Sequence, residues 1–324
     1  MQSSWPMSRP DADKVSKVAT IGAGPIGAGW AAHFLARGFE VTAYIHSMDE
    51  RAAFNQILDT GWISLEAIGL VEGASRDKLT VTDDLQAAMA TAEFVQECAP
   101  ERLELKQALY TQLDEFVAED IVIASSTSGL TMTDIQKDCA SAGRTVIGHP
   151  FNPPYLLPLV EIVGGKRTDP TTVDWAHDFY KYAGKAPLVM KKEIPGFVAT
   201  RLQEALWREA LHMVANGEAT PQDIDTALIN GPAPRMAVQG QCMAFHVACG
   251  EGGMATNLDQ FGPALKLPWT RLEAPELTPE LRDLMVEGCE QASEGRHFSD
   301  MAAERDRAIV AVLKAIANAN TKAV

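Results

Sequence analysis

The sequence predicts an α/β fold, with a Rossmann-type doubly wound sheet domain followed by an all-α C-terminal domain. Three observations lead to this prediction. A glycine-rich turn at residues 22–27 lies between a short apolar run and a helical pattern, further apolar runs alternate with helical stretches, and strand signals almost vanish after residue 197. Strands that alternate with helices are typical of a mostly parallel sheet, and 324 residues are enough for two domains.

The first elements are expected to be a strand, a turn, a helix and a second strand. Val18–Ile21 is a short apolar run that stops at Gly22, and apolar residues then recur at helical spacing from residue 26 to residue 35. Gly38 ends that helix, and EVTAY at residues 40–44 has the branched and aromatic residues of a strand.

Later strands are expected in EFVQECA, DIVIASS and RTVIGHP, with the helical stretch ERLELKQALYTQLDEFV between the first two. From Phe197 onward the pattern is helical, and Thr220 is expected to cap a helix with Pro221 in its first turn. The chain is therefore expected to have three parts: a flexible leader at residues 1–14, a dinucleotide-binding Rossmann domain at 15–195 and a helical substrate and dimerisation domain at 196–324.

Composition and charge exclude several classes of function. The net charge of −15 argues against nucleic acid and anionic membranes as partners, and no apolar run is long enough to span a membrane. The five cysteines are odd in number and form no CxxC pair, which favours free thiols in a reducing cytoplasm. No metal-binding spacing such as HExxH occurs, so no metal site is predicted.

The turn Gly22-x-Gly24-x-x-Gly27 follows a strand and opens a helix, and in this context the pattern predicts a dinucleotide site. The first glycine permits a tight bend, the second lets the backbone approach a pyrophosphate, and the third lets helix and strand pack closely. The phosphates then meet the positive end of the helix, in a turn that also contains Pro25 and Ile26. The alternative is a turn that is merely tight.

Ile45 stands at the end of the second strand, where a dinucleotide-binding protein usually has an acid for the ribose 2′-hydroxyl. Ile45 accepts no hydrogen bond, and its presence removes a charge that would repel a 2′-phosphate. Three candidate donors to such a phosphate follow within six residues: His46, Ser47 and Arg51. NADP is thus a candidate cofactor, and the alternative is that Asp49 or Glu50 serves as a displaced acid.

Two side chains stand out in GHPFNPPYLLPLVEIVGG, residues 148–165: His149 and Glu161. Four prolines between them exclude an ordinary helix and fix the path from one to the other. His149 follows a predicted strand and Ser128 follows the strand before it, so both are expected at the edge of the sheet that faces the ligand crevice. For an isolated pair the alternative is a core histidine and a surface glutamate, and Ser128 alone equally suits a turn cap.

Five motifs together resemble the 3-hydroxyacyl-CoA dehydrogenase superfamily: GAGPIGAGWA, PERLELK, SSTSGL, HPFNPPYLLPLVE and KEIPGFVATRL. The resemblance covers nearly the whole chain after residue 15. Within the superfamily, RLQEALWREALHMV and EGGMATNLDQFGPALKLPWT look like the L-carnitine dehydrogenase branch. Relatives that act on L-gulonate lack that tail. The resemblance implies NAD as the first-choice cofactor and a homodimer as the assembly.

The resemblance also implies a histidine–glutamate dyad, carried here onto His149 and Glu161, with Ser128 at the substrate oxygen. Three further residues match positions near the cofactor in the family: Glu101, Lys106 and Asn152. A neutral imidazole suits removal of a hydroxyl proton while hydride leaves for the nicotinamide, since the pKa of free histidine is about 6.5. A carboxylate behind the imidazole fixes its tautomer and stabilises the imidazolium.

Two further positions depart from the family pattern, besides the missing acid at Ile45. Acyl-CoA relatives have asparagine where this chain has Thr200, and the carnitine branch usually shows Arg-Trp-Ala where this chain has Arg235-Met236-Ala237. Met236 replaces a large aromatic with a flexible thioether, which would reshape a substrate pocket. Natural divergence and engineering are both open as explanations of these changes and of Ile45.

The sequence therefore predicts an oxidoreductase that transfers hydride between a nicotinamide cofactor and a small 3-hydroxy acid, with conversion of L-carnitine to 3-dehydrocarnitine as the expected reaction. A quaternary ammonium favours aromatic faces, and four aromatics are candidates, with core packing as the alternative for each: Tyr155, Trp207, Phe245 and Trp269. Other interpretations are a dehydrogenase for acyl-CoA or L-gulonate, a variant that reduces non-natural ketones or imines with NADPH, and a non-enzymatic cofactor-binding protein. The intact Ser128, His149 and Glu161 argue against the last, and the acidic charge argues against a CoA substrate.

Overall fold

The computed structural model describes residues 9–249, 251 and 253–271, together with a few short stretches and single residues: 276, 278–281, 283, 294, 300, 303, 307, 309–315 and 318. The chain divides into two compact units. The first comprises Met1–Val198 and Ala303–Ala315, and the second comprises Ala199–Ala302 and Ile316–Val324.

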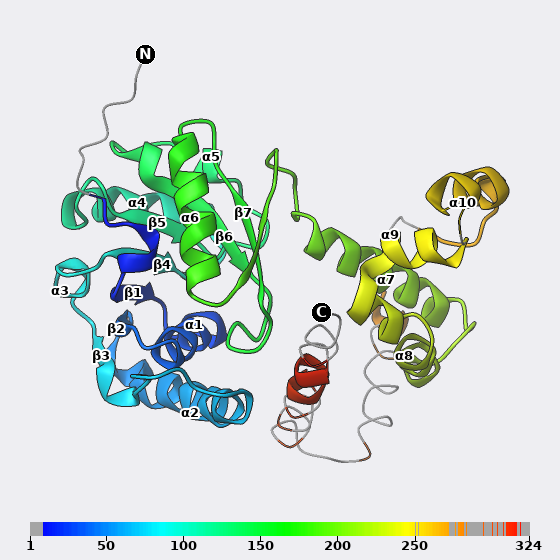
Figure 1. The fold of residues 1–324 in the computed structure, drawn as a ribbon, viewed down its shortest axis with the longest axis horizontal. Helices are drawn as coiled ribbons and strands as arrows, with labels where there is room; N and C mark the ends of the chain where they lie inside the picture. The colour runs from blue at the N-terminus through cyan, green and yellow to red at the C-terminus, as the bar shows by residue number, and fades with distance from the viewer. Residues whose placement is uncertain are drawn as a thin grey trace. The chain divides into compact units, whose positions relative to one another are not determined.

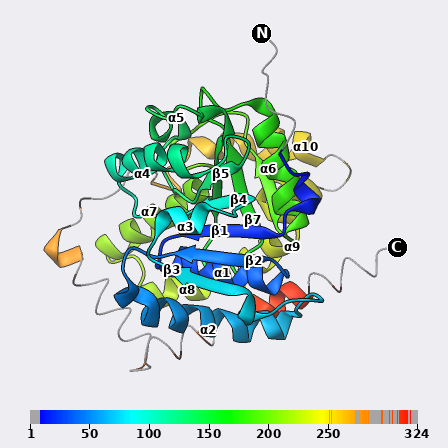
Figure 2. The same cartoon turned by 90° about the vertical axis from the view of Figure 1, so that its left-hand side faces the viewer.

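An eight-stranded sheet forms the centre of the first unit, in the order β3-β2-β1-β4-β5-β6-β7-β8. In chain order its strands are β1 Lys17–Ile21, β2 Glu40–Tyr44, β3 Leu79–Thr82, β4 Phe94–Glu97, β5 Val122–Ser125, β6 Thr145–Pro150, β7 Leu159–Val163 and β8 Ala186–Val189. Neighbouring strands pair in parallel except β6 and β7, which are antiparallel. Figure 2 shows β3, β2, β1 and β4 in succession.

Helices cover both faces of this sheet, which confirms the predicted doubly wound class (Figure 1). The helices of the first unit are α1 Pro25–Ala36, α2 Arg51–Ile68, α3 Leu85–Met89, α4 Leu103–Phe116, α5 Met132–Ile135 and α6 Pro170–Tyr182. One apolar cluster joins α1, α2 and α6 to the sheet, and a second joins α3, α4 and α5 to it. Every residue of β4, β5 and β6 is buried, because these strands are covered on both faces.

The first described residues are tied to the first unit. Arg9 donates from Nε to the Asp120 carbonyl at 3.1 Å and from Nη2 to Thr172 Oγ1 at 3.2 Å, while Trp175 Nε1 donates to the Pro10 carbonyl at 2.8 Å. A short 3₁₀ turn, Ala12–Lys14, follows. Residues 1–8 of the expected leader lie outside the described residues, and Arg9 and Pro10 are in contact with the first unit.

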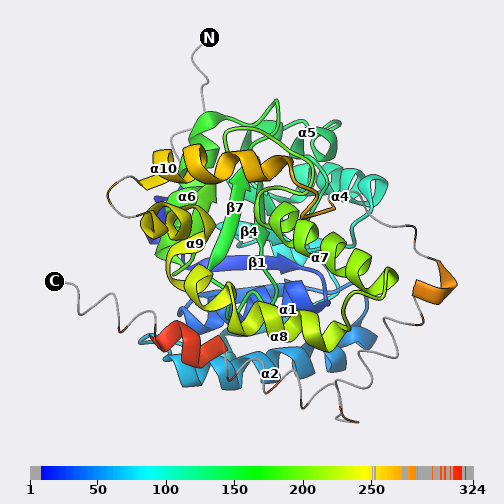
Figure 3. The same cartoon turned by 90° about the vertical axis from the view of Figure 1, so that its right-hand side faces the viewer.

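The second unit is helical in its described part (Figure 3). Its helices are α7 Ala199–Ala215, α8 Pro221–Asn230, α9 Ala233–Ala248 and α10 Gly253–Phe261. The predicted cap of α8 is confirmed, since Thr220 and Asp223 form a reciprocal capping box with Pro221 in the first turn. Across the part of the chain that the structure describes, none of the helices combines the length and the apolar character that a membrane crossing requires.

Candidate active site

The glycine turn has the geometry that a bound pyrophosphate requires. Gly22 has a φ of +118°, and a Cβ there would lie 2.6 Å from the carbonyl oxygen of Cys98. A Cβ at Gly27 would lie 2.1 Å from the Gly22 carbonyl oxygen, so the turn and α1 pack in direct contact. At Gly24 nothing lies within 4 Å of such an atom. The open space at the N-terminus of α1 therefore fits a phosphate group, which the positive end of the helix would attract.

The end of β2 shows a different environment from the one expected around Ile45. Its side chain is fully buried in the core, so it contributes no surface to the crevice. The Ser47 hydroxyl caps the turn that follows, and Glu50 Oε2 accepts the His46 N–H at 3.1 Å. Arg51 begins α2 and is exposed. An acid is thus fixed at the end of β2 after all, by its bond to the backbone of His46.

A buried ion pair lies at the end of β4. Lys106 Nζ on α4 donates to Glu97 Oε1 at 2.6 Å and to the Ala99 carbonyl at 3.0 Å. The Ser125 hydroxyl donates to the other oxygen of Glu97 at 2.6 Å. The side chains of Lys106 and Glu97 are 1% and 0% exposed, so the ammonium forms its hydrogen bonds within the protein and not with solvent. Glu97 was not predicted from the sequence, although an acid at the end of an apolar strand is a signal of such a network.

Glu101 shapes the turn that carries Ser128. Its Oε1 accepts the backbone N–H groups of Ser128 at 2.9 Å and Gly129 at 3.1 Å, and it also accepts the Thr127 hydroxyl. Its other oxygen lies 3.9 Å from Lys106 Nζ. Glu101 was expected near the cofactor, and here its carboxylate holds the turn at the end of β5. Ser128 itself is exposed, so its hydroxyl is accessible to a ligand.

His149 and Glu161 face each other as partners in the ladder between β6 and β7. His149 Nδ1 lies 2.9 Å from Glu161 Oε2, with the two residues 4% and 0% exposed. His149 was expected to follow its strand, but it lies within β6, and the antiparallel return of β7 brings the glutamate alongside. An ionised carboxylate can only accept a hydrogen bond, so Nδ1 carries the proton of the neutral imidazole. Nε2 then carries no proton and is able to accept one.

A buried lysine, Lys185, holds the loop between these two strands through hydrogen bonds to its backbone. Lys185 Nζ donates to the carbonyl oxygens of Pro154 and Leu157 and lies 4.8 Å from the centre of the Trp30 ring. Burial lowers the pKa of Lys185 to about 7, whereas the carbonyl oxygens and the ring face favour its ammonium form. The anchored loop also contains Asn152, which is exposed close to the end of β6.

The expected substrate-binding side chains separate into two groups. Tyr155 is 8% exposed and packs in the core beside Gly61, so its ring supports the loop. Thr200 and Trp207 lie on α7, and Met236 and Phe245 lie on α9, all in the second unit. Trp207, Phe245 and Trp269 are 48%, 40% and 71% exposed, and the Arg235 guanidinium lies 6.0 Å from the Phe245 ring.

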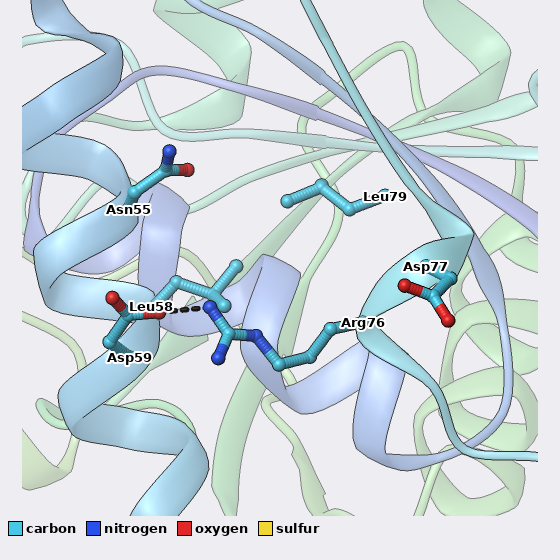
Figure 4. A pocket seen from close by; sticks show the side chains of 6 residues that line it. All are labelled: Asn55, Leu58, Asp59, Arg76, Asp77 and Leu79. Atoms are coloured by element: carbon cyan, nitrogen blue, oxygen red, sulfur yellow. Dashed lines mark hydrogen bonds and ion pairs between the residues drawn. The ribbon is translucent and has the colours of Figure 1, made fainter.

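A pocket elsewhere in the first unit is unrelated to these residues (Figure 4). It lies between α2 and the start of β3 and is lined by Asn55, Leu58, Asp59, Arg76, Asp77 and Leu79. Arg76 forms an ion pair with Asp59 across it. The pocket is at the amino end of β3, whereas ligands of parallel sheets bind at the carboxyl ends.

The parallel strands collect the candidate site residues at one edge. The glycine turn follows β1, the Glu97–Lys106 pair and Glu101 follow β4, and Ser128 follows β5. His149 lies near the end of β6, the next strand in the sheet. Because β1, β4, β5 and β6 are consecutive parallel neighbours, their carboxyl ends form one continuous edge. A nucleotide at the turn and an alcohol at the histidine fit this arrangement.

Comparisons with known proteins agree with this geometry. Residues 17–194 match the NAD binding domain of 3-hydroxyacyl-CoA dehydrogenase, and residues 196–287 match its C-terminal domain. The chain is 57% identical over 303 residues to L-carnitine dehydrogenase of Streptomyces griseus, covering 94% of this chain and 90% of that protein. It is 52% identical over 309 residues to L-carnitine dehydrogenase of Nocardiopsis dassonvillei, covering 95% and 94%.

Solved structures give the same grouping. The chain is similar to 5-formyl-3-hydroxy-2-methylpyridine 4-carboxylic acid 5-dehydrogenase, an NAD-dependent dismutase, with a TM-score of 0.79 and 28% identity over 93% of this chain and 98% of that one. It is also similar to 3-hydroxybutyryl-CoA dehydrogenase of Escherichia coli, with a TM-score of 0.64 and 25% identity over 86% of this chain and 58% of that one.

Proposed function

The chain belongs to the 3-hydroxyacyl-CoA dehydrogenase family, and we propose that it oxidises L-carnitine to 3-dehydrocarnitine with NAD as the hydride acceptor. The reaction type, NAD-dependent oxidation of a 3-hydroxy acid, follows from the family. The observation that carries the chemistry is the contact of 2.9 Å between His149 Nδ1 and Glu161 Oε2 at the edge of the sheet that bears the glycine turn. L-carnitine as the substrate is supported by relatives of that activity, which match nearly the whole chain.

Each protein group has a simple task in this reaction. The glycine turn and the N-terminus of α1 would hold the pyrophosphate of NAD, and the cofactor, when bound, would supply the acceptor for hydride from the carbon that carries the hydroxyl. His149 Nε2 takes the hydroxyl proton, while Glu161 holds the imidazole through Nδ1 and stabilises its protonated form. Ser128 donates a hydrogen bond to the substrate oxygen. The products are the 3-keto acid, the reduced cofactor and a proton.

A substrate and cofactor panel tests this proposal. We expect oxidation of L-carnitine with NAD, and use of NADP with a catalytic efficiency less than about a thousandfold lower, which is about 4 kcal/mol. Ile45 offers no charge to repel a 2′-phosphate, and Arg51 is exposed nearby, whereas the Glu50 carboxylate opposes NADP. A larger preference for NAD would show that another acid replaces the missing one, and L-carnitine left unoxidised with both cofactors would refute the proposed substrate.

Glu50→Gln provides the internal test of the cofactor proposal. The glutamine amide retains an oxygen that accepts the His46 N–H, but it carries no charge. The ratio of the catalytic efficiency with NAD to that with NADP should therefore decrease. Asp49→Asn is the matched control, since Asp49 is exposed in the same turn. An equal decrease of this ratio in both variants would show that the total negative charge around the crevice, and not Glu50 in particular, sets the cofactor preference.

The proposed assembly is a homodimer joined through the helical unit. On α7, Leu202 and Leu206 are 64% and 51% exposed, and their spacing of four residues places them on one face. We expect light scattering at micromolar concentration to give twice the chain mass of 35.0 kDa. Leu206→Glu should lower this to the monomer mass, whereas Ile63→Glu, at an exposed apolar residue of α2, should leave it unchanged. A monomer mass for the unaltered protein would contradict the proposal.

The cysteines support a reducing compartment, and we place the protein in the cytoplasm on that ground. Cys98, Cys139, Cys242 and Cys249 are free thiols. Burial raises the pKa of Cys98 and of Cys139 to about 12, so both stay protonated and unreactive at neutral pH.

A further inference from the structure

We propose that Phe197 is a positioning residue for the pair of His149 and Glu161. The proposal rests on the proposed function, because it concerns the orientation of the base in that reaction. Phe197 has a φ of +49°, in the left-handed region that bulky side chains rarely enter. Its side chain is fully buried. A strained backbone beneath a fully buried ring calls for an explanation in terms of what the ring contacts.

The backbone of this turn reaches the glutamate. Gly196 and Phe197 are both left-handed, with φ of +71° and +49°, and the Phe197 N–H donates to the Ile194 carbonyl at 3.1 Å. The reversal directs the next amide at the pair, since Val198 N–H donates to Glu161 Oε1 at 2.9 Å. One oxygen of Glu161 therefore holds His149 while the other is held by the turn that carries Phe197.

The ring of Phe197 reaches the histidine. Its centroid lies 5.2 Å from that of the imidazole, with the two planes at 49°. Phe151 lies 5.8 Å from the same imidazole, at 70°. Two aromatic rings and one carboxylate thus limit the rotation of the His149 side chain. The buried ring also keeps water from the Nδ1–carboxylate contact, where water would compete for the same hydrogen bonds.

A purely structural role accounts for less of this geometry. Phe197 belongs to the apolar cluster that also contains Val163 and Met132, so its burial alone would fit a core residue. A core residue gains nothing from a left-handed backbone, and glycine would adopt this φ at lower cost. The strain is explained if the chain needs both the reversal that aims Val198 N–H at Glu161 and a ring on the reversing residue.

Three variants separate the ring from the backbone: Phe197→Leu, Phe197→Ala and Phe197→Gly. The glycine variant relieves the left-handed strain and keeps the turn, but it has no ring. Phe94→Leu is the matched control, because Phe94 is also fully buried and packs 4.1 Å from Phe179 in the other apolar cluster. It should lower the melting temperature and leave turnover unchanged.

Two readouts report on position rather than on folding. In the free protein, the imidazole nitrogen signals of His149 report its tautomer, and we expect a single Nδ1-protonated form to become a mixture in all three variants. In steady state with L-carnitine and saturating NAD, kcat should fall about tenfold for leucine and about a hundredfold for alanine and glycine, the range expected for a misplaced catalytic group. The KM for L-carnitine and the affinity for NAD should stay within about threefold.

Unchanged kcat and an unchanged tautomer signal in folded leucine and glycine variants would overturn the proposal. An equal loss of kcat in Phe94→Leu would overturn it too, because any buried phenylalanine would then matter alike. If alanine prevents folding, the leucine and glycine variants decide the matter. If the unaltered protein leaves L-carnitine unoxidised, the proposed function fails, while the tautomer signal of the free protein still tests the role of Phe197.

Discussion

Replacing His149 with alanine is expected to lower kcat by at least about a hundredfold, the lower range for removal of a general base. The affinity for NAD should change little, because the proposed site of its phosphates is the glycine turn, several strands away in the sheet. Without the imidazole no group at this position takes the hydroxyl proton as hydride leaves. Steady-state rates with L-carnitine and a cofactor titration of both proteins make the comparison.

A second substitution guards against loss of folding. Alanine leaves the buried carboxylate of Glu161 without its contact to Nδ1, so His149→Asn is preferable as a companion. Asparagine offers an N–H donor near the same place but no basic nitrogen, so it should restore stability without restoring turnover. His177→Ala is the matched control, because His177 is exposed and pairs with Asp178 at 2.9 Å. Near-normal turnover in His149→Ala would remove this residue from the mechanism.

The glycine turn and the fold class could be predicted because their signals are local. Gly22, Gly24 and Gly27 form a pattern within six residues, and at Gly27 the steric demand comes from the Gly22 carbonyl oxygen, whereas the close approach of Gly22 to Cys98 is seen only in the folded structure. The alternation of apolar runs with helical stretches likewise reports the parallel sheet directly. Thr220 is a third example, since a cap is decided within one turn of a helix.

Pairings between distant residues could not be predicted in the same way. The prolines between His149 and Glu161 indicated a rigid path, but the antiparallel pairing of β6 and β7 depends on register across the loop, which periodicity does not report. Burial was also missed at Ile45 and Tyr155, because each lies at the end of a strand or in a loop that another helix covers. Such positions look exposed until the packing of the helices is known.

Lys106 illustrates the limit of a resemblance. The family pattern suggests a contact with the cofactor, and it gives no sign of the hydrogen bond that Lys106 Nζ donates to Glu97, nine residues earlier. The contact arises because α4 folds back over the end of β4 and buries both charges. Removing one partner of such a buried pair leaves the other charge without compensation, since neither charge has access to water.

Replacing Lys106 with methionine is therefore expected to lower the free energy of unfolding by about 3–5 kcal/mol, the usual result of removing one partner of a buried ion pair. The carboxylate of Glu97 would keep only the Ser125 hydroxyl and the Ala99 N–H as partners while remaining fully buried. Urea denaturation, followed by the fluorescence of the buried Trp30 and the other tryptophans, measures the change from the transition midpoint.

Two further variants decide whether the loss of stability comes from the unpaired carboxylate of Glu97. Adding Glu97→Gln to Lys106→Met removes the uncompensated carboxylate and keeps an oxygen for Ser125, so the double variant should be more stable than the single one. Lys17→Met breaks an exposed pair with Glu40 at 3.9 Å, where the two side chains are 43% and 61% exposed, and should cost less than about 1 kcal/mol. If Lys106→Met costs no more than Lys17→Met, the Glu97–Lys106 pair does not stabilise the carboxyl edge of the sheet. If the double variant is the less stable of the two, the cost of Lys106→Met lies in lost packing of the lysine side chain, because removing the charge of Glu97 would then have brought no relief.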